Sequence, residues 1–308
     1  MLDGAPDMAT AQHLGYMRDA SPPVVESLRR HTFDITGIRS EDYLDEGAEA
    51  RQRFAEKLHA LCALEGDELL VGEPRELGGF GYELGGGLYN LETLKFFECL
   101  IALQRGGVLG GLRDRPAVVW EVGAGWGGFA YQLKTLCPQA TYVIVDMPEF
   151  FLFSAVYLMA LFPQARVRFW QEKESEELLD SLDEVDFVFI PVGALDSTRP
   201  ARLDLALNVV SAREMTTAHV DSFVKRAHEL GCPYFYGLNR PERLRRLLAR
   251  YYWLHPVPVL PVPYHRPLEH PPFKGKLGRG VQVLRRRLEA EATGDDYEHV
   301  VGWRRAAA

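Results

Sequence analysis

A glycine-rich turn after a short apolar run carries the residues best suited to chemistry. Val118–Trp120 are apolar and predict the end of a buried strand, Glu121 follows them, and a helical pattern begins at Phe129. Glycine lets the backbone bend sharply and come close to a ligand. The stretch therefore predicts a strand, a tight turn and a helix N-terminus beside a ligand. The glycines of the turn are Gly123, Gly125, Gly127 and Gly128.

Two kinds of ligand fit this turn. Gly123, Gly125 and Gly128 have the Gly-x-Gly-x-x-Gly spacing of a phosphate-binding dinucleotide motif. Glu121 lies two residues before the first glycine, where a carboxylate would repel a pyrophosphate and suit an ammonium group. The pattern favours a ligand with a cationic amino-acid end, which is what S-adenosylmethionine presents. A turn of a parallel sheet that binds nothing is the alternative.

A second apolar run supports the same ligand. Tyr142–Val145 are followed by Asp146, which lies 25 residues after Glu121. An acid at this place in a βαβ unit accepts hydrogen bonds from ribose hydroxyls. We therefore expect the ligand to lie across Gly123–Gly127, with Asp146 on its ribose.

Composition excludes several classes of protein. The chain has 308 residues, of which 47% are hydrophobic and 25% charged, which is typical of a globular protein. Its net charge of −8 argues against a nucleic-acid partner. The sequence shows neither a leader nor an apolar run of membrane-spanning length, so we expect a cytoplasmic protein without a membrane partner. No His/Asp cluster has metal-ligand spacing, and we expect no metal.

The N-terminal third of the chain predicts a helical cap. Residues 48–64 repeat their apolar side chains at helical spacing, and Asn90 is placed to cap a second helix. Between them, residues 78–87 contain six glycines, which indicates either a lid over a ligand or a plain surface loop. We therefore divide the chain into a cap at residues 1–110 and a catalytic domain at residues 111–308.

Strand and helix patterns alternate after the glycine turn. After Asp146 the predicted strands span 185–191, 203–211 and 233–239. A helix is predicted at 150–162, before the first of them, and another at 216–230, between the last two. Such alternation is typical of a mostly parallel, doubly wound α/β sheet. Further predictions are a short strand at 166–170, a polar helix at 172–183, a proline-rich surface excursion at 256–272 and a last strand at 299–303.

Four motifs in this order resemble a known class of enzyme. They are Glu121–Gly128, Tyr142–Pro148, Leu207–Met215 and Tyr234–Asn239. The first two resemble motifs I and II of the class I S-adenosylmethionine-dependent methyltransferases. Together the four look like the sugar O-methyltransferase family found in bacterial polysaccharide and natural-product gene sets. The resemblance covers about residues 88–240 and the closing strand at 297–303.

The resemblance implies a fold, a cofactor and a set of binding residues. The fold is the Rossmann-like fold of these methyltransferases with an N-terminal helical cap, and the cofactor is S-adenosyl-L-methionine, with S-adenosyl-L-homocysteine as product. The turn at 192–196 lies where this class of enzyme usually binds the adenine. The implied cofactor-binding residues are Glu121, Gly123, Ala124, Gly125, Gly127, Asp146, Met147, Pro191, Val192, Asn208 and Ser211.

Methylation of an alcohol also needs a group that removes its proton. In an open α/β sheet such groups lie beyond the carboxyl ends of the strands. Glu214 follows the fourth strand and is the first candidate for the base, although a helix-capping role is an equal alternative. Tyr236 and Asn239 close the fifth strand, and we expect both to line the pocket around the sulfonium. Further candidates for the base are His219, Tyr82 and Tyr89.

The predicted function is transfer of a methyl group to a hydroxyl of a sugar or another small natural product. One alternative is an enzyme that uses the aminocarboxypropyl chain of S-adenosylmethionine and releases methylthioadenosine. A second alternative is a cofactor-binding partner protein without catalytic activity. The sequence does not distinguish between acceptors, nor does it give the oligomeric state.

Overall fold

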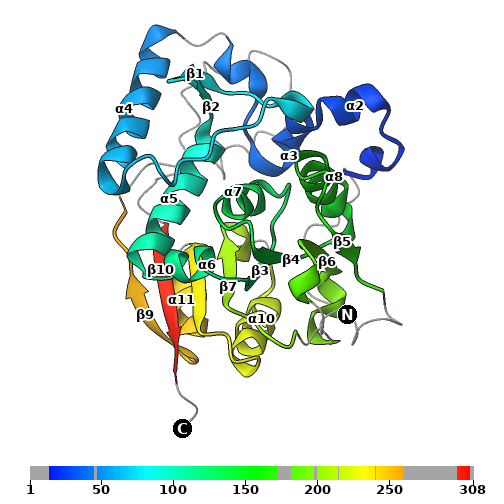
Figure 1. Ribbon diagram of the computed structural model, residues 1–308, viewed down its shortest axis with the longest axis vertical. Helices are drawn as coiled ribbons and strands as arrows, with labels where there is room; N and C mark the ends of the chain where they lie inside the picture. Colours follow the sequence, from blue (N-terminus) through cyan, green and yellow to red (C-terminus); the bar gives the residue numbers. More distant parts are fainter. Residues whose placement is uncertain are drawn as a thin grey trace, which may run out of the picture.

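One eight-stranded sheet forms the centre of the molecule (Figure 1). The computed structural model describes residues 14–44, 47–171, 182–197, 200–213, 215–239, 241–259 and 297–305. The strand order is β5-β6-β4-β3-β7-β8-β10-β9. The strands are β3 (Ala117–Val122), β4 (Ala140–Asp146), β5 (Val167–Phe169), β6 (Phe187–Pro191), β7 (Leu205–Val209), β8 (Tyr234–Asn239), β9 (Tyr252–Pro256) and β10 (Glu298–Arg304).

The sheet is parallel except at one end. Strands β5 to β8 pair in parallel, whereas β10 lies antiparallel between β8 and β9. The prediction of a doubly wound, mostly parallel sheet is confirmed. The last predicted strand, at 299–303, is confirmed as β10.

Both faces of the sheet are buried under helices. Side chains of a strand alternate between its faces: Val118 and Trp120 face one core, which includes Phe223 of α10, and Val119 faces the other, which includes Phe129 of α7. This explains why the strands read as continuous apolar runs. The helices of the catalytic region are α5 (Leu91–Arg105), α6 (Leu109–Arg113), α7 (Gly128–Leu136), α8 (Phe151–Leu161), α10 (Thr217–Glu229) and α11 (Pro241–Leu248).

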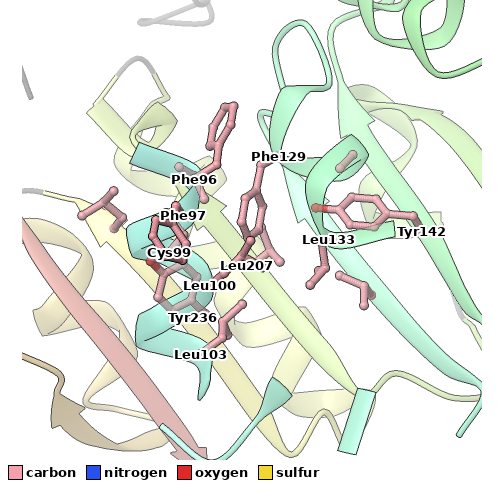
Figure 2. Close-up of a cluster of buried hydrophobic side chains, with 14 of the residues drawn as sticks. Phe96, Phe97, Cys99, Leu100, Leu103, Phe129, Leu133, Tyr142, Leu207 and Tyr236 are labelled. Atoms are coloured by element: carbon pink, nitrogen blue, oxygen red, sulfur yellow. The ribbon is translucent and has the colours of Figure 1, made fainter. Parts of the chain in front are cut away.

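Aromatic side chains fill the core between α5, α7 and the sheet (Figure 2). Phe96 and Phe97 of α5 lie in the same cluster as Phe129 of α7 and Tyr142 of the sheet. The Phe96 and Phe129 rings are 5.7 Å apart between centroids, within the range of favourable aromatic contacts. This packing fixes α5 across the strands.

The N-terminal elements gather at one end of the molecule, at the top of Figure 1. Met17, Leu28 and Phe54 belong to the same hydrophobic core as the sheet, so the core runs across the predicted division at residue 110, which stays a prediction. The elements are α2 (Pro22–Glu26), α3 (Phe33–Thr36), α4 (Ala48–Glu65), β1 (Tyr82–Leu84) and β2 (Gly87–Tyr89), with 3-10 helices at Leu14–Asp19, Leu28–Thr32, Ser40–Tyr43 and Glu76–Gly78.

The glycine-rich segment at 78–87 contains a hairpin. Strands β1 and β2 pair antiparallel, and the turn between them consists of Gly85 (φ 59°) and Gly86 (φ 88°). Two successive positive φ angles suit a tight hairpin turn, which explains this glycine pair. Tyr82 points into the cap, where its ring centroid lies 5.1 Å from that of Phe54. Asn90 caps α5 as predicted, accepting a hydrogen bond from the Thr93 N–H.

Several predicted boundaries differ from the structure. The strand predicted at 203–211 ends at Val209, because Val210 takes a positive φ of 65° and a 3-10 turn begins at Ser211. The proline-rich stretch begins inside an edge strand, since β9 runs to Pro256. The proline-rich residues 260–272 lie outside the described residues. The same holds for the polar helix predicted at 172–183, except that a 3-10 turn begins at Leu182 near its end.

The described residues hold neither a membrane-spanning helix nor a cluster of metal ligands. None of the helices placed in the structure is both long and apolar enough to cross a bilayer. Within the same part of the chain, no three His, Cys, Asp or Glu side chains are placed to hold a metal ion together.

Candidate functional site

The glycine turn between β3 and α7 has the conformation that its sequence predicts. Gly123, Gly125 and Gly127 have φ angles of 76°, 58° and 86°, in the left-handed region that favours glycine. A Cβ on Gly123 would overlap the side chain of Ser211, and one on Gly127 would lie 3.1 Å from Ser154 Cα. Both the backbone conformation and the close packing therefore require glycine here.

Asp146 holds this turn in place from the end of β4. Its Oδ2 accepts a hydrogen bond from the Gly125 N–H (2.8 Å) and its Oδ1 one from the Met147 N–H (2.8 Å). Hydrogen bonds to an ionised carboxylate are stronger than neutral ones. Pro191 is the partner of Asp146 on β6, and Val192 follows it. The structure thus brings together the predicted glycine, acid and adenine-side residues.

Glu121 lies beside the turn in a buried position. The residue is 2% exposed, and the Tyr142 hydroxyl donates a hydrogen bond to Glu121 Oε2 at 2.7 Å. Burial raises the pKa of Glu121 to about 8; the Tyr142 hydrogen bond opposes this shift and the nearby Asp146 adds to it. The carboxyl is therefore mostly protonated at neutral pH.

A polar network joins the ends of β3, β7 and β8. Asn208 Nδ2 donates to the Val122 carbonyl (2.8 Å) and to Ser211 Oγ (2.6 Å). Asn239 Nδ2 donates to Asn208 Oδ1 (2.9 Å), and Ser211 Oγ donates to the Val122 carbonyl (3.1 Å). Three predicted site residues, Asn208, Ser211 and Asn239, therefore lie in one cluster next to Gly123.

This cluster lies at the point where the strand order reverses. The chain passes from β3 to β4 on one side, and β7 later takes the place on the other side of β3. In open α/β sheets, ligands bind outside the carboxyl ends of the strands at such a point. Val210 has a positive φ of 65° here, and backbone strain at a β-branched residue is common at ligand sites. The geometry thus makes this edge of the sheet the candidate ligand site.

The structure separates Tyr236 from this cluster. Tyr236 and Asn239 are three residues apart on β8, so their side chains point to opposite faces. Tyr236 is fully buried under α5, and its hydroxyl is 2.8 Å from Nδ1 of His299. His299 Nε2 in turn lies 3.6 Å from Oε2 of Glu98. The Tyr236 hydroxyl therefore lies in the core among buried polar side chains, with His299 and Glu98, and not in the cluster next to Gly123.

The remaining candidates for the base have different placements. Glu214 lies outside the described residues. His219 is in the first turn of α10, where its backbone N–H donates to the Oγ1 of Thr216, the N-cap of the helix. Tyr82 and Tyr89 belong to the β1–β2 hairpin of the cap.

Sequence reasoning missed the contact between the cap and the glycine turn. Trp126, inside the turn, donates from Nε1 to Glu92 Oε2 (3.1 Å), and the Arg29 guanidinium lies 3.6 Å from the Trp126 ring centroid. Arg29 is fully buried and pairs with Glu73 at 2.5 Å. The tryptophan between two glycines was the sequence feature that could have drawn attention to this contact. The local pattern does not indicate Arg29 as its partner, because Arg29 lies 97 residues away.

Comparisons with known proteins give a weak structural likeness. No protein-family model and no curated protein matches the chain. Among solved structures it is similar to precorrin-6y C5,15-methyltransferase of Geobacter metallireducens GS-15, with 13% identity, a TM-score of 0.38, and coverage of 65% of this chain and 87% of that one. The pyocyanin biosynthetic protein PhzM is 12% identical with a TM-score of 0.38, and the match covers 67% of this chain and 57% of that one. An rRNA methylase of Streptococcus thermophilus is 9% identical with a TM-score of 0.37, and the match covers 66% of this chain and 95% of that one. Likeness of this size carries no conclusion about cofactor or reaction.

Proposed function

We propose that the protein binds S-adenosylmethionine across Gly123–Gly127 and transfers its methyl group to a hydroxyl of a small molecule, such as a sugar or a natural product. The observation that carries this proposal is the grouping of Glu121, the glycine turn and Asp146 in one βαβ unit at the strand-order reversal. A phosphate-binding turn would not place a buried acid two residues before its first glycine.

Each part of this group suits one part of the cofactor. Asp146 suits the ribose hydroxyls, because a carboxylate oxygen can accept more than one hydrogen bond. Glu121 suits the ammonium of the amino-acid end. Ala124, Met147, Pro191 and Val192 flank the same edge and suit the adenosine part.

When bound, S-adenosylmethionine supplies a methyl group on a positively charged sulfur. The chain must hold an acceptor oxygen in line with that methyl and exclude water. Asn239 and Ser211 suit the task of holding the acceptor, since both carry polar groups at the carboxyl edge of the sheet. The cap suits the exclusion of water, because Arg29 stacks on Trp126 and a Cβ at Gly125 would lie 3.3 Å from Ile35.

Glu214 remains our candidate for the base, with Asn239 orienting the acceptor. Tyr236 does not act on the acceptor in this proposal, because its hydroxyl is buried and faces His299. The pKa of Tyr236 is held well above its ordinary value, mainly by burial, so the phenol keeps its proton at neutral pH.

The by-product of the reaction tests this function. The protein is incubated with methyl-labelled S-adenosylmethionine and a panel of sugars, nucleotide sugars, small phenols and RNA. Label in a small hydroxyl compound together with S-adenosylhomocysteine is expected. Methylthioadenosine would instead indicate use of the aminocarboxypropyl chain, label in RNA would contradict the acceptor class, and binding without turnover of any substrate would favour a partner protein.

A further inference from the structure

A buried acid beside the glycine turn lacks the partner that its charge needs. Among the described residues, the one hydrogen bond to the Glu121 carboxyl comes from the Tyr142 hydroxyl, which reaches Oε2. Tyr142 is itself fully buried. An ionised carboxylate that has lost its water and gained one neutral donor is strongly disfavoured. The geometry therefore favours the protonated form of Glu121 as long as the site holds no cation.

The charged and titratable groups around Glu121 include no cation in contact with its carboxyl. The charge of Lys95 on α5 lowers the pKa of Glu121 and so opposes part of the effect of burial, but Lys95 Nζ is bound to Glu92, 2.5 Å from Oε1. Cys99, also on α5, is neutral because burial raises the pKa of its thiol to about 12. On β4, Asp146 adds a negative charge to the surroundings of Glu121, and Tyr142 is neutral. The net effect holds the pKa of Glu121 at about 8.

We propose that binding of the cofactor's ammonium group is coupled to release of one proton from Glu121. This inference rests on the proposed function, since it assigns the amino-acid end of S-adenosylmethionine to this carboxyl. The Glu121 O–H bond breaks, the proton passes to the solvent buffer, and the carboxylate forms an ion pair with the ammonium. Tyr142 is a positioning residue, because its hydroxyl donates to Oε2 in both states.

The coupling has a calculable size. With a pKa of about 8, roughly nine in ten molecules carry the proton at pH 7, so binding releases about 0.9 proton per site. Affinity for a ligand with the ammonium then rises up to about tenfold per pH unit between pH 6 and 8. Above pH 8 this dependence on Glu121 fades, because a growing share of the free sites is already ionised.

Titration calorimetry with two ligands tests the coupling. S-adenosylhomocysteine carries the amino-acid end, whereas methylthioadenosine lacks it and keeps the adenosine. Each is titrated at pH 7 in phosphate and in Tris, whose heats of ionisation differ, so the difference in measured heat counts the protons released. Nearly one proton is expected for S-adenosylhomocysteine and none for methylthioadenosine.

Two variants complete the experiment. Glu121→Gln is expected to bind S-adenosylhomocysteine more weakly and without proton release. Tyr142→Phe is expected to keep the release and lose affinity, because it removes a donor to the charged form. Heats independent of the buffer, equal release with both ligands, or release that persists in Glu121→Gln would each overturn the proposal while leaving cofactor binding intact. If the first variant does not fold, a flat affinity of the native protein between pH 6 and 8 overturns it equally. Failure to bind either ligand would refute the proposed cofactor, and this inference with it.

Discussion

Replacing Asp146 by alanine separates the two tasks that the structure gives to this side chain. In the folded protein the carboxylate accepts from the Gly125 and Met147 N–H groups, both at 2.8 Å. A hydrogen bond to a charged group contributes about 1.5–3 kcal/mol, and partial replacement by water reduces the sum, so we expect Asp146→Ala to lower the free energy of unfolding by about 2–4 kcal/mol.

The same substitution removes the acceptor for the ribose hydroxyls. Loss of this contact is expected to weaken binding of S-adenosylhomocysteine by about 1.5–3 kcal/mol, which is roughly 10- to 150-fold in Kd. Titration calorimetry at 15 °C measures the affinity, and urea unfolding at the same temperature reports the fraction that is folded.

Asp186 offers a matched control at the opposite edge of the sheet. Its carboxylate also accepts hydrogen bonds from Lys134 Nζ (2.9 Å) and the Arg166 backbone N–H (2.9 Å), with a longer one from Arg166 Nε (3.4 Å). Asp186→Ala is therefore expected to lower stability without changing the affinity of the folded protein. Unchanged affinity in folded Asp146→Ala would remove Asp146 from the ligand site, and equal losses of affinity in both variants would show a general effect of instability.

Further substitutions test the packing and charge around the site. Gly123→Ala forces a Cβ into Ser211 at a φ of 76°, so we expect it to lose roughly 1–3 kcal/mol in urea unfolding. Arg29→Met leaves Glu73 charged and buried, which is expected to lower the free energy of unfolding by about 3–5 kcal/mol. The double variant Arg29→Met with Glu73→Leu should recover most of this loss. A double variant no more stable than Arg29→Met would contradict the pairing. The unfolded chain releases the Glu121 proton near pH 4.5 and the folded chain near 8, so stability falls by up to about 1.4 kcal/mol per pH unit between those values. Glu121→Gln should remove this slope, and an identical slope in both proteins would refute the burial argument.

Local patterns in the sequence determined most of the sheet and the turn. Apolar runs of strand length followed by Glu121 or Asp146 predicted β3 and β4, because a strand buried on both faces needs apolar side chains at successive positions. The glycines of the turn were predictable for the same local reason: a positive φ and a close approach need a residue without a Cβ. These features depend on neighbours in the chain.

The tertiary structure alone decided which side chains meet. Tyr236 and Asn239 close one strand, yet the two-residue period of the strand turns them to opposite faces, so the expected shared pocket did not follow. Tyr142 meets Glu121 through the parallel pairing of two strands, and Arg29 reaches Trp126 across 97 residues. Such contacts have no local signature, because they arise when separate elements pack and burial then sets the charge of each group.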